Sequence, residues 1–169
     1  MKLNYQEKIA LKNLLKNKIN RENLHLDSIY KKLSKDSNIT LYIDGASDLH
    51  SKTAGIGGVI YKADEEVFSF SEYLHDATNN EAEYKALVLG LKYLLEFKFL
   101  NPKIFSDSEL IVKQVNGEYK VKNERMKVLH SEVISLLDNF ESWRLTHILR
   151  EKNKVADQLA NEGRKKATF

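Results

Sequence analysis

Two glutamates near the start of a predicted helix fall on different faces of that helix, so we expect them to have different roles. Thr78-Asn79-Asn80-Glu81 has the spacing of a capping box, in which a threonine hydroxyl and a glutamate satisfy helix amides. We therefore expect Glu81 to cap the helix and to share its wet face with Lys85 and Lys92. Glu83 falls on the apolar face of the same helix, where a carboxylate is costly unless it is paired, hydrogen-bonded or bound to a cation. Glu83 is a candidate ligand, and a glutamate that reaches water from the edge of the core is the alternative.

Three further carboxylates occupy positions next to the predicted core, where a carboxylate is unfavourable. Asp44 interrupts an alternating strand, Asp107 ends a short strand, and Asp157 borders the small-residue face of the last helix. Asp107 would also suit the cap of the helix after it. Gathered in one place, the four would repel by several kcal/mol at an effective dielectric of ~20, so cations must hold them together. Oxygen ligands without thiolate select Mg²⁺ or Mn²⁺, and a pair of such ions ~4 Å apart is the usual device for phosphoryl displacement.

Composition is that of an ordinary soluble protein with one domain and a small extension. The chain has 169 residues, of which 42% are hydrophobic and 30% charged. It has no cysteine, which excludes disulfides and thiolate metal sites and fits a reducing cytoplasm. The first residues lack the apolar core of a signal peptide, and no run approaches membrane-spanning length. We expect a cytoplasmic protein with no membrane partner.

Residues 1–38 form a basic extension that differs from the body of the chain. Nine lysines and arginines stand against four acidic residues there, giving +5, while residues 39–169 carry −2. The spacing of its apolar residues predicts two short helices with a break at 20–23. Each helix has one apolar stripe, formed by Leu11, Leu14, Leu15 and Ile19 in the first and by Leu26, Ile29, Tyr30 and Leu33 in the second. The charge favours nucleic acid as a partner, and a solvated helix face explains it equally well.

The rest of the chain alternates strands and helices in the manner of an α/β domain. Strands are predicted at 39–45, 54–61, 67–74, 103–107 and 143–149, and helices at 79–99, 108–112, 124–140 and 155–166. The first three strands read as an antiparallel meander, and the later strand-helix-strand order implies parallel crossovers with ligands at the carboxyl ends of the strands. The packing face of the last helix is expected to be Val155, Ala156, Leu159, Ala160 and Gly163.

Five segments in residues 39–166 together resemble the type 1 ribonucleases H. They are Tyr42-Ile43-Asp44-Gly45-Ala46-Ser47, Gly55-Ile56-Gly57-Gly58, Thr78-Asn79-Asn80-Glu81-Ala82-Glu83, Ser106-Asp107-Ser108 and Asn153-Lys154-Val155-Ala156-Asp157-Gln158-Leu159-Ala160. The resemblance implies a ribonuclease H-like α/β fold: a five-stranded mixed sheet, strands one to three antiparallel and the rest parallel, flanked by helices. It also implies an endonuclease that hydrolyses the RNA strand of RNA/DNA hybrids with two Mg²⁺ ions, or Mn²⁺ as substitute, leaving 5′-phosphate and 3′-hydroxyl ends.

The same resemblance implies roles for individual residues. Asp44, Glu83, Asp107 and Asp157 would be the metal ligands, with Asp44 bridging both ions. The substrate-binding positions would be Thr78 and Asn123 on a phosphate of the DNA strand, and Asn79, Asn80 and the backbone of Gly45, Ala46 and Ser47 on ribose 2′-hydroxyls. Lys120, Lys122 and Arg125 stand where a longer basic helix and loop hold substrate in bacterial members, as a reduced substitute.

The short loop before the last helix departs from the bacterial members and is closer to an archaeal-like branch. Arg150-Glu151-Lys152-Asn153 replaces a longer histidine-bearing loop, which implies that Arg150 assists turnover. His147 is interpreted as a packing or surface residue. The extension lacks the hybrid-binding module that precedes some family members, so its role does not follow from the resemblance.

Two other readings of the function remain open at this stage. One is a catalytically weak or silent nucleic-acid-binding protein on the same fold, and the other is a DNA-cutting nuclease related to integrases or junction resolvases. Fold alone does not separate them. Cleavage of RNA/RNA duplexes and the oligomeric state are also left open.

Overall fold

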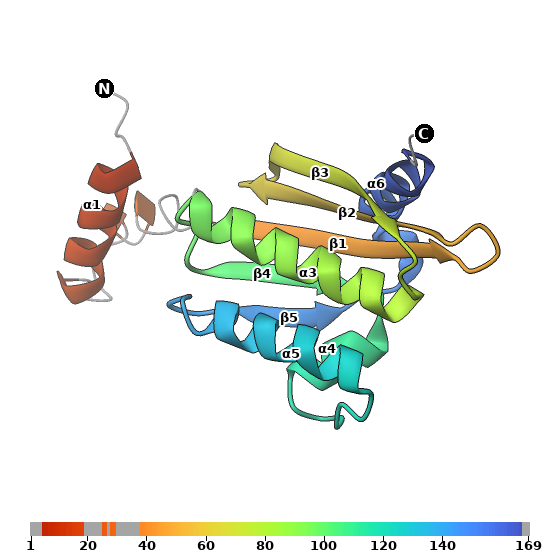
Figure 1. Cartoon of the computed structure of the whole chain (residues 1–169). Helices are drawn as coiled ribbons and strands as arrows, with labels where there is room; N and C mark the ends of the chain where they lie inside the picture. Colours follow the sequence, from red (N-terminus) through yellow and green to blue (C-terminus); the bar gives the residue numbers. More distant parts are fainter. Residues whose placement is uncertain (1–4, 19–24, 27, 30–37, 167–169) are drawn as a thin grey trace.

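The computed structural model describes residues 5–18, 25–26, 28–29 and 38–166. A five-stranded sheet in the order β3-β2-β1-β4-β5 forms its centre (Figure 1). The strands are β1 (Ile39–Asp48), β2 (Thr53–Lys62), β3 (Glu65–His75), β4 (Pro102–Ser106) and β5 (Arg144–His147). The helices are α1 (Tyr5–Lys18), α3 (Asn79–Glu96), α4 (Glu109–Val115), α5 (Glu124–Leu137) and α6 (Lys154–Lys165), with the short 3₁₀ helix η1 (Arg150–Lys152).

The sheet is mixed, as the sequence predicts. β1 pairs antiparallel with β2, and β2 with β3, so the first three strands form a meander. β1 pairs parallel with β4, and β4 with β5. The predicted α/β fold with a five-stranded mixed sheet is therefore confirmed. Because β1, β4 and β5 run the same way, their carboxyl ends meet at one edge.

Helices cover both faces of this sheet. α3 and α5 lie over one face and α6 over the other (Figure 1). Leu41 and Ile43 of β1, Leu87 and Leu91 of α3, and Ile104 of β4 are fully buried in the core between β1, α3 and β4. Both α3 and α5 begin at the end of the sheet where β1 finishes (Figure 1), so their first turns border that edge.

The packing face of α6 is narrower than predicted. Ala156, Ala160 and Gly163 are buried, but Val155 is 45% exposed. Small residues suffice because the helix backbone lies directly on β2: a Cβ at Gly57 would come within 2.3 Å of the Ala160 amide nitrogen. Val155, at the start of the helix, lines a cavity together with Val59 of β2 and so stays partly open to solvent.

Only part of the N-terminal extension belongs to the described residues. α1 confirms the first predicted helix, with Leu15 buried but Leu14 59% exposed, so its predicted stripe is only partly covered. Residues 25–26 and 28–29 are helical, while the predicted break at 20–23 lies outside the described residues. Within the described ranges, no helix has the length and apolarity to cross a membrane.

The contact between Gly57 and α6 predicts a sharp difference between two glycine substitutions. Gly57→Ala would drive a methyl group into helix backbone, and we expect a loss of about 1–3 kcal/mol or more in the free energy of unfolding. At Gly90, the added Cβ meets the movable end of the Leu41 side chain at 2.7 Å, and alanine gains about 1 kcal/mol of helix propensity. Urea denaturation of both variants should show a clear loss only for Gly57→Ala; equal stabilities would contradict the backbone contact.

Candidate active site

A cleft of about 760 Å³ opens at the carboxyl ends of β1 and β4. It contains all four carboxylates that the sequence singles out, Asp44, Glu83, Asp107 and Asp157, and it contains Arg150. These residues come from β1, α3, the end of β4, α6 and η1. The topology therefore brings together side chains that lie far apart in the sequence.

Glycine at position 45 allows Glu83 to approach Asp44. A Cβ at Gly45 would lie 2.3 Å from the Glu83 amide nitrogen and 2.5 Å from the Ala82 carbonyl carbon, so only glycine lets α3 lie this close to β1. Asp44 and Glu83 are 5% and 4% exposed. The apolar-face position predicted for Glu83 is confirmed, and its carboxylate is buried against the end of β1.

Asp107 is not used as a helix cap. Ser108 is the N-cap of α4, and its hydroxyl accepts a hydrogen bond from the Ile111 amide at 3.4 Å. The alternative reading of Asp107 as a cap is therefore wrong, because the serine after it takes that position. The Asp107 carboxylate instead accepts a hydrogen bond from the Asn153 side-chain amide at 3.2 Å.

Asn153 ties the elements of the site together. Its Nδ2 donates to the Ile43 carbonyl at 2.9 Å as well as to Asp107, and the residue is 1% exposed. It also stands immediately before α6. One buried amide thus links β1, the end of β4 and the helix that carries Asp157.

The three more buried carboxylates form a compact group, and the fourth lies beside it. One carboxylate oxygen each of Asp44, Glu83 and Asp107 lie within 4.8 Å of one another. Asp157 pairs with Arg150, whose Nη2 donates to Oδ1 at 2.8 Å. The Arg150 side chain is 77% exposed and that of Asp157 30%, so this ion pair forms the outer wall of the cleft.

The grouping strongly disfavours ionisation of the two most buried carboxylates. Burial, and then the charges of Asp107 and Asp157, raise the pKa of Asp44. Burial, and then the charges of Asp44 and Asp107, raise the pKa of Glu83. Both shifts have the sign expected for carboxylates placed near one another without a cation.

The oxygen atoms of this group fit a hard divalent cation. Glu83 Oε2 is buried without a hydrogen-bond partner, an arrangement that costs free energy unless something binds it. Mg²⁺ and Mn²⁺ prefer carboxylate oxygens, and a bound dication would favour the ionised forms of Asp44, Glu83 and Asp107. The residues present therefore fit a divalent metal site.

Glu81 caps α3 as predicted, but it does not lie on a wet face. Its Oε2 accepts hydrogen bonds from the Thr78 amide and hydroxyl, both at 2.9 Å. Oε1 lies 2.9 Å from Arg125 Nε, and the residue is only 6% exposed. Glu81 and Lys92 do lie on the same side of α3, as predicted, because both pair with residues of α5: Glu81 with Arg125 and Lys92 with Glu132. The packing of α5 against α3 covers this side of the helix.

The expected substrate-binding residues divide into two groups. Gly45, Ala46, Ser47 and Asn79 line the cleft with the carboxylates. Asn80 is exposed but is not among the lining residues. Thr78 and Asn123 are the N-caps of α3 and α5, and Lys120 borders a separate groove between α4 and α5. Lys122 is exposed close to that groove. The second group therefore lies outside the cleft, around the start of α5.

Sequence reasoning missed two residues of α6 that line the cleft, Asn161 and Arg164. The Arg164 Nη1 donates to Asp48 Oδ2 at 3.4 Å, while its Nε is buried without a partner. The only available signal was helical spacing, since both follow Asp157 on one side of the helix at intervals of four and seven residues. Arg164 adds a second cation to the cleft, where it pairs with Asp48 while Arg150 pairs with Asp157.

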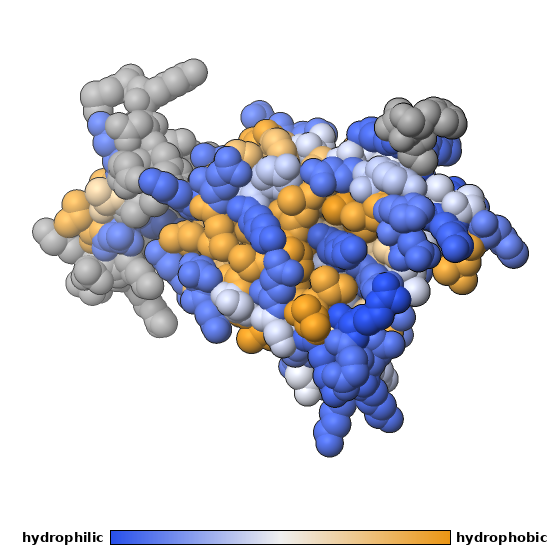
Figure 2. All heavy atoms as spheres, viewed as in Figure 1, coloured by the Kyte–Doolittle hydropathy of each residue, from blue (hydrophilic) through white to orange (hydrophobic). Residues whose placement is uncertain are grey.

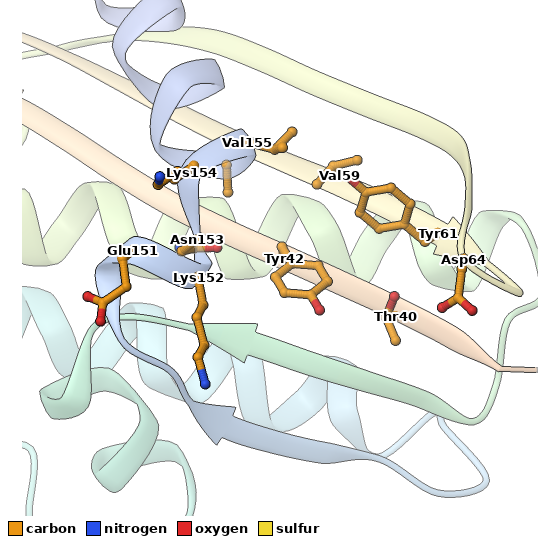
Figure 3. A pocket seen from close by; sticks show the side chains of 11 residues that line it. Thr40, Tyr42, Val59, Tyr61, Asp64, Glu151, Lys152, Asn153, Lys154 and Val155 are labelled. Atoms are coloured by element: carbon orange, nitrogen blue, oxygen red, sulfur yellow. The ribbon is translucent and has the colours of Figure 1, made fainter.

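A second cavity, of about 330 Å³, lies on the α6 face of the sheet. Figure 3 shows the rings of Tyr42 and Tyr61 beside the first residues of α6. None of the four carboxylates lines it, and the two carboxylates that do, Asp64 and Glu151, lie at opposite ends of it (Figure 3). Asn153 borders this cavity and also bonds to Asp107, so one buried amide separates it from the cleft.

Residues 42–163 match the family model described as "Reverse transcriptase-like". The chain is 34% identical over 122 residues to Ribonuclease HI of Halobacterium salinarum. Its structure resembles the crystal structure of RNase H1 from that archaeon, with a TM-score of 0.72, 32% identity and coverage of 77% of this chain and 99% of the other. The chain belongs to the type 1 ribonuclease H family.

Other family members extend the comparison. LC11-RNase H1, solved in complex with an RNA/DNA hybrid, has a TM-score of 0.71 and 36% identity, covering 77% of this chain and 99% of that one. The chain spans 61% of the length of the halobacterial Ribonuclease HI and 35% of a "Bifunctional protein" of Mycobacterium tuberculosis to which it is 30% identical. Family membership thus concerns the ribonuclease H domain.

Glu83→Gln is expected to stabilise the metal-free protein at neutral pH. Because the folded-state pKa values of Asp44 and Glu83 are raised, the folded protein binds more protons than the unfolded chain above about pH 4. Its stability therefore falls as the pH rises from there. Removing one carboxylate should make stability fall less steeply with pH and should raise the melting temperature at pH 7 by about 2–4 °C or more. The measurement is thermal melting in the presence of a chelator, between about pH 5 and pH 8.

Glu81→Gln is the matched control, and the opposite sign is expected. Although burial raises the pKa of Glu81, hydrogen bonds from Thr78 and the charge of Arg125 lower it overall. A lowered folded-state pKa stabilises the protein above about pH 4 and loses that contribution as the pH falls. Glu81→Gln should therefore melt at a lower temperature than the unmodified protein at pH 7. Similar losses in both variants would show that Glu83 is not strained by its neighbours.

Proposed function

We propose that this protein is an endonuclease that hydrolyses the RNA strand of RNA/DNA hybrids, with two Mg²⁺ ions at the site or Mn²⁺ in their place. The observation that carries the proposal is the convergence of Asp44, Glu83 and Asp107 within 4.8 Å, with Glu83 Oε2 buried and unpartnered. Membership of the ribonuclease H family supports it, as does the RNA/DNA hybrid bound by LC11-RNase H1.

The four carboxylates would act as metal ligands, with Asp44 between the other three. When bound, the two ions would activate a water molecule and stabilise the charge on the leaving oxygen. The reaction places the water oxygen on phosphorus and breaks the bond to the 3′ oxygen, which takes up a proton. The products are a 5′-phosphate and a 3′-hydroxyl. Asn153 fixes the position of Asp107 by its hydrogen bond.

The cleft also offers groups that could distinguish RNA from DNA. Asn79 and the backbone of Gly45, Ala46 and Ser47 lie at the cleft with the carboxylates, within reach of a strand whose phosphate is held there. Hydrogen bonds to the ribose 2′-hydroxyl are how a protein tells RNA from DNA at a given position. We infer that these groups read the strand that is cut.

The proposed activity is tested on matched RNA/DNA, RNA/RNA and DNA/DNA duplexes with and without Mg²⁺. We expect metal-dependent cleavage of the RNA strand of the hybrid, with 5′-phosphate ends on the products. Asp107→Asn should reduce the rate by about 100-fold or more, since one of the charges that hold the cations is lost. Asp138→Asn, an exposed aspartate at the end of α5, is the control and should cleave normally.

The same assay separates the alternative functions. Binding without cleavage of any duplex would favour a silent nucleic-acid-binding protein, and cleavage of DNA/DNA would favour an integrase-like or resolvase-like nuclease. Either result would overturn the proposal. Cleavage of RNA/RNA beside the hybrid would retain the reaction and widen the substrate class to any duplex containing an RNA strand.

A separate test concerns Arg150, which we propose assists turnover. Its guanidinium lines the cleft and pairs with Asp157, whereas His147 is exposed at the end of β5 and does not line the cleft. Arg150→Ala should lower kcat by about tenfold or more with little change in KM, the pattern of an interaction made in the transition state. His147→Ala should be much milder. Equal kcat values for Arg150→Ala and the unmodified enzyme would remove this role.

A further inference from the structure

The second cavity lies beside the start of α6, on the face of the sheet that α3 and α5 do not cover. Figure 2 views the molecule from the side of α3 and α5, where hydrophobic side chains lie between hydrophilic ones. On the other face, α6 packs against β1, β2 and β3. Thr40 and Tyr42 of β1 and Tyr61 of β2 line the cavity there and remain partly exposed. The residues around this cavity determine what it can hold.

The cavity is lined by a buried acceptor atom that has no donor. Asn153 lines the cavity and does not line the cleft. It is 1% exposed, and its Oδ1 has no hydrogen-bond partner among the described residues. Its Nδ2 donates to the Ile43 carbonyl and to Asp107, so a flipped amide would set an oxygen against two acceptors. The orientation of the amide is therefore fixed, and a molecule that brings an O–H or N–H donor would satisfy Oδ1.

The start of α6 offers unused donors at the same place. The Asp157 amide donates to the Asn153 carbonyl at 3.0 Å, and Asn153 provides no side-chain cap. The amides of residues 154–156, the first three of the helix, have no acceptor within the described ranges, and all three residues line the cavity. In Figure 3, α6 begins beside the cavity and runs away from it. An uncapped helix N-terminus in this orientation favours an anion.

Two lysines strengthen this preference for an anion. Lys152 and Lys154 line the cavity, and Figure 3 shows their side chains on either side of Asn153. In the part of the chain that the structure describes, neither ammonium group is paired with a carboxylate. The carboxylates that line the cavity, Asp64 and Glu151, lie at its opposite ends. A phosphate at the start of α6 would thus meet backbone amides and two ammonium groups.

Aromatic rings form another wall of the cavity. The Tyr42 ring is stacked on Phe105, with the ring centroids 4.9 Å apart and the planes at 25°. It meets the Tyr61 ring at 86°, with the centroids 5.9 Å apart. Two rings at right angles form a corner in which a third planar ring lies against the face of one and the edge of the other. A nucleobase has the shape that suits this corner.

We propose that this cavity binds a ribonucleoside monophosphate. The base lies against Tyr42 and Tyr61, and a ribose hydroxyl donates to Asn153 Oδ1. The phosphate lies at the start of α6, between Lys152 and Lys154. The volume of about 330 Å³ is at the lower end of the ~300–1,000 Å³ typical of small-molecule sites, which suits a single nucleotide. None of these residues lines the cleft, so the inference does not rest on the proposed function.

Binding is tested with adenosine 5′-monophosphate (AMP) as the probe, by calorimetry and amide NMR in chelator, so that metal ions in the cleft cannot hold it. We expect a Kd of about 10–100 µM and shifted amide signals at residues 154–156. Adenosine lacks the phosphate and 2′,3′-dideoxyadenosine 5′-monophosphate lacks the hydroxyls, so each should bind about tenfold more weakly. Equal affinities for the three compounds, no binding at millimolar AMP, or equally tight binding of inorganic phosphate would overturn the proposal.

Matched variants locate the ligand on the protein. Tyr61→Ala should weaken AMP binding about tenfold, whereas Tyr61→Phe keeps the ring and should bind normally. Tyr119→Ala removes an exposed tyrosine elsewhere and should also bind normally. Lys154→Ala should weaken AMP binding about fivefold and leave adenosine binding unchanged, with Lys165→Ala in the last turn of α6 as its control. Unchanged affinity in both Tyr61→Ala and Lys154→Ala would overturn the site, as would equal losses in the controls.

A cleavage assay keeps this inference separate from the proposed function. Without nucleotide, Tyr61→Ala should cleave an RNA/DNA hybrid with the kcat and KM of the unmodified protein, because Tyr61 does not line the cleft. Cleavage of the hybrid by a protein that does not bind AMP overturns only this inference. AMP binding by a protein that cleaves no duplex overturns only the proposed function. AMP binding that requires Mg²⁺ and persists in Tyr61→Ala would place the nucleotide at the carboxylates, and this inference would then be wrong.

Discussion

Direct contact between helix backbone and strand backbone is the constraint on which the site depends. α3 lies against β1 at Gly45, and α6 lies against β2 at Gly57, where any Cβ would meet helix backbone within 2.3 Å. Gly57 is the register partner of Asp44. The two contacts therefore fix both helices against the end of β1, and Glu83 and Asp157 approach Asp44 from opposite faces of the sheet. The distances among the carboxylates are therefore set by the packing of backbone on backbone. The choice of side-chain rotamers alone could not bring them so close.

The close grouping of carboxylates lowers the stability of the metal-free fold. Burial and mutual repulsion raise the pKa values of Asp44 and Glu83, so the metal-free site opposes folding at neutral pH. The surrounding core, with Leu41, Ile43 and Leu91 fully buried, supplies the stabilisation that offsets this cost. Apolar residues of similar volume would stabilise the fold better than this cluster of carboxylates. Cation binding therefore accounts for the presence of carboxylates at these positions.

The sequence predicted those features that local patterns determine. Asp44 breaks a strand alternation and Glu83 breaks an apolar helix face, so both could be recognised without the structure. The burial of Glu81 could not, because its partner Arg125 comes from a helix more than forty residues later. The bonds that Asn153 and Arg164 make could not be predicted for the same reason, since their partners Asp107 and Asp48 are far away in the sequence. The partial exposure of Val155 was not predicted, because periodicity carries no information on how closely a helix approaches a strand.

The charge of the cleft explains why grip on a nucleic acid has to come from outside it. Five carboxylates line the cleft, the four proposed ligands and Asp48, against the two cations Arg150 and Arg164. Both cations are already paired, with Asp157 and Asp48. A polyanion therefore gains little from the cleft's own side chains until divalent cations reverse the local charge. Arg125 lies away from this repulsion, with its single carboxylate partner buried beneath it. A site that gathers acids in this way can hold a polyanion only through bound divalent ions or through cations placed at a distance from the carboxylates, as Arg125 is.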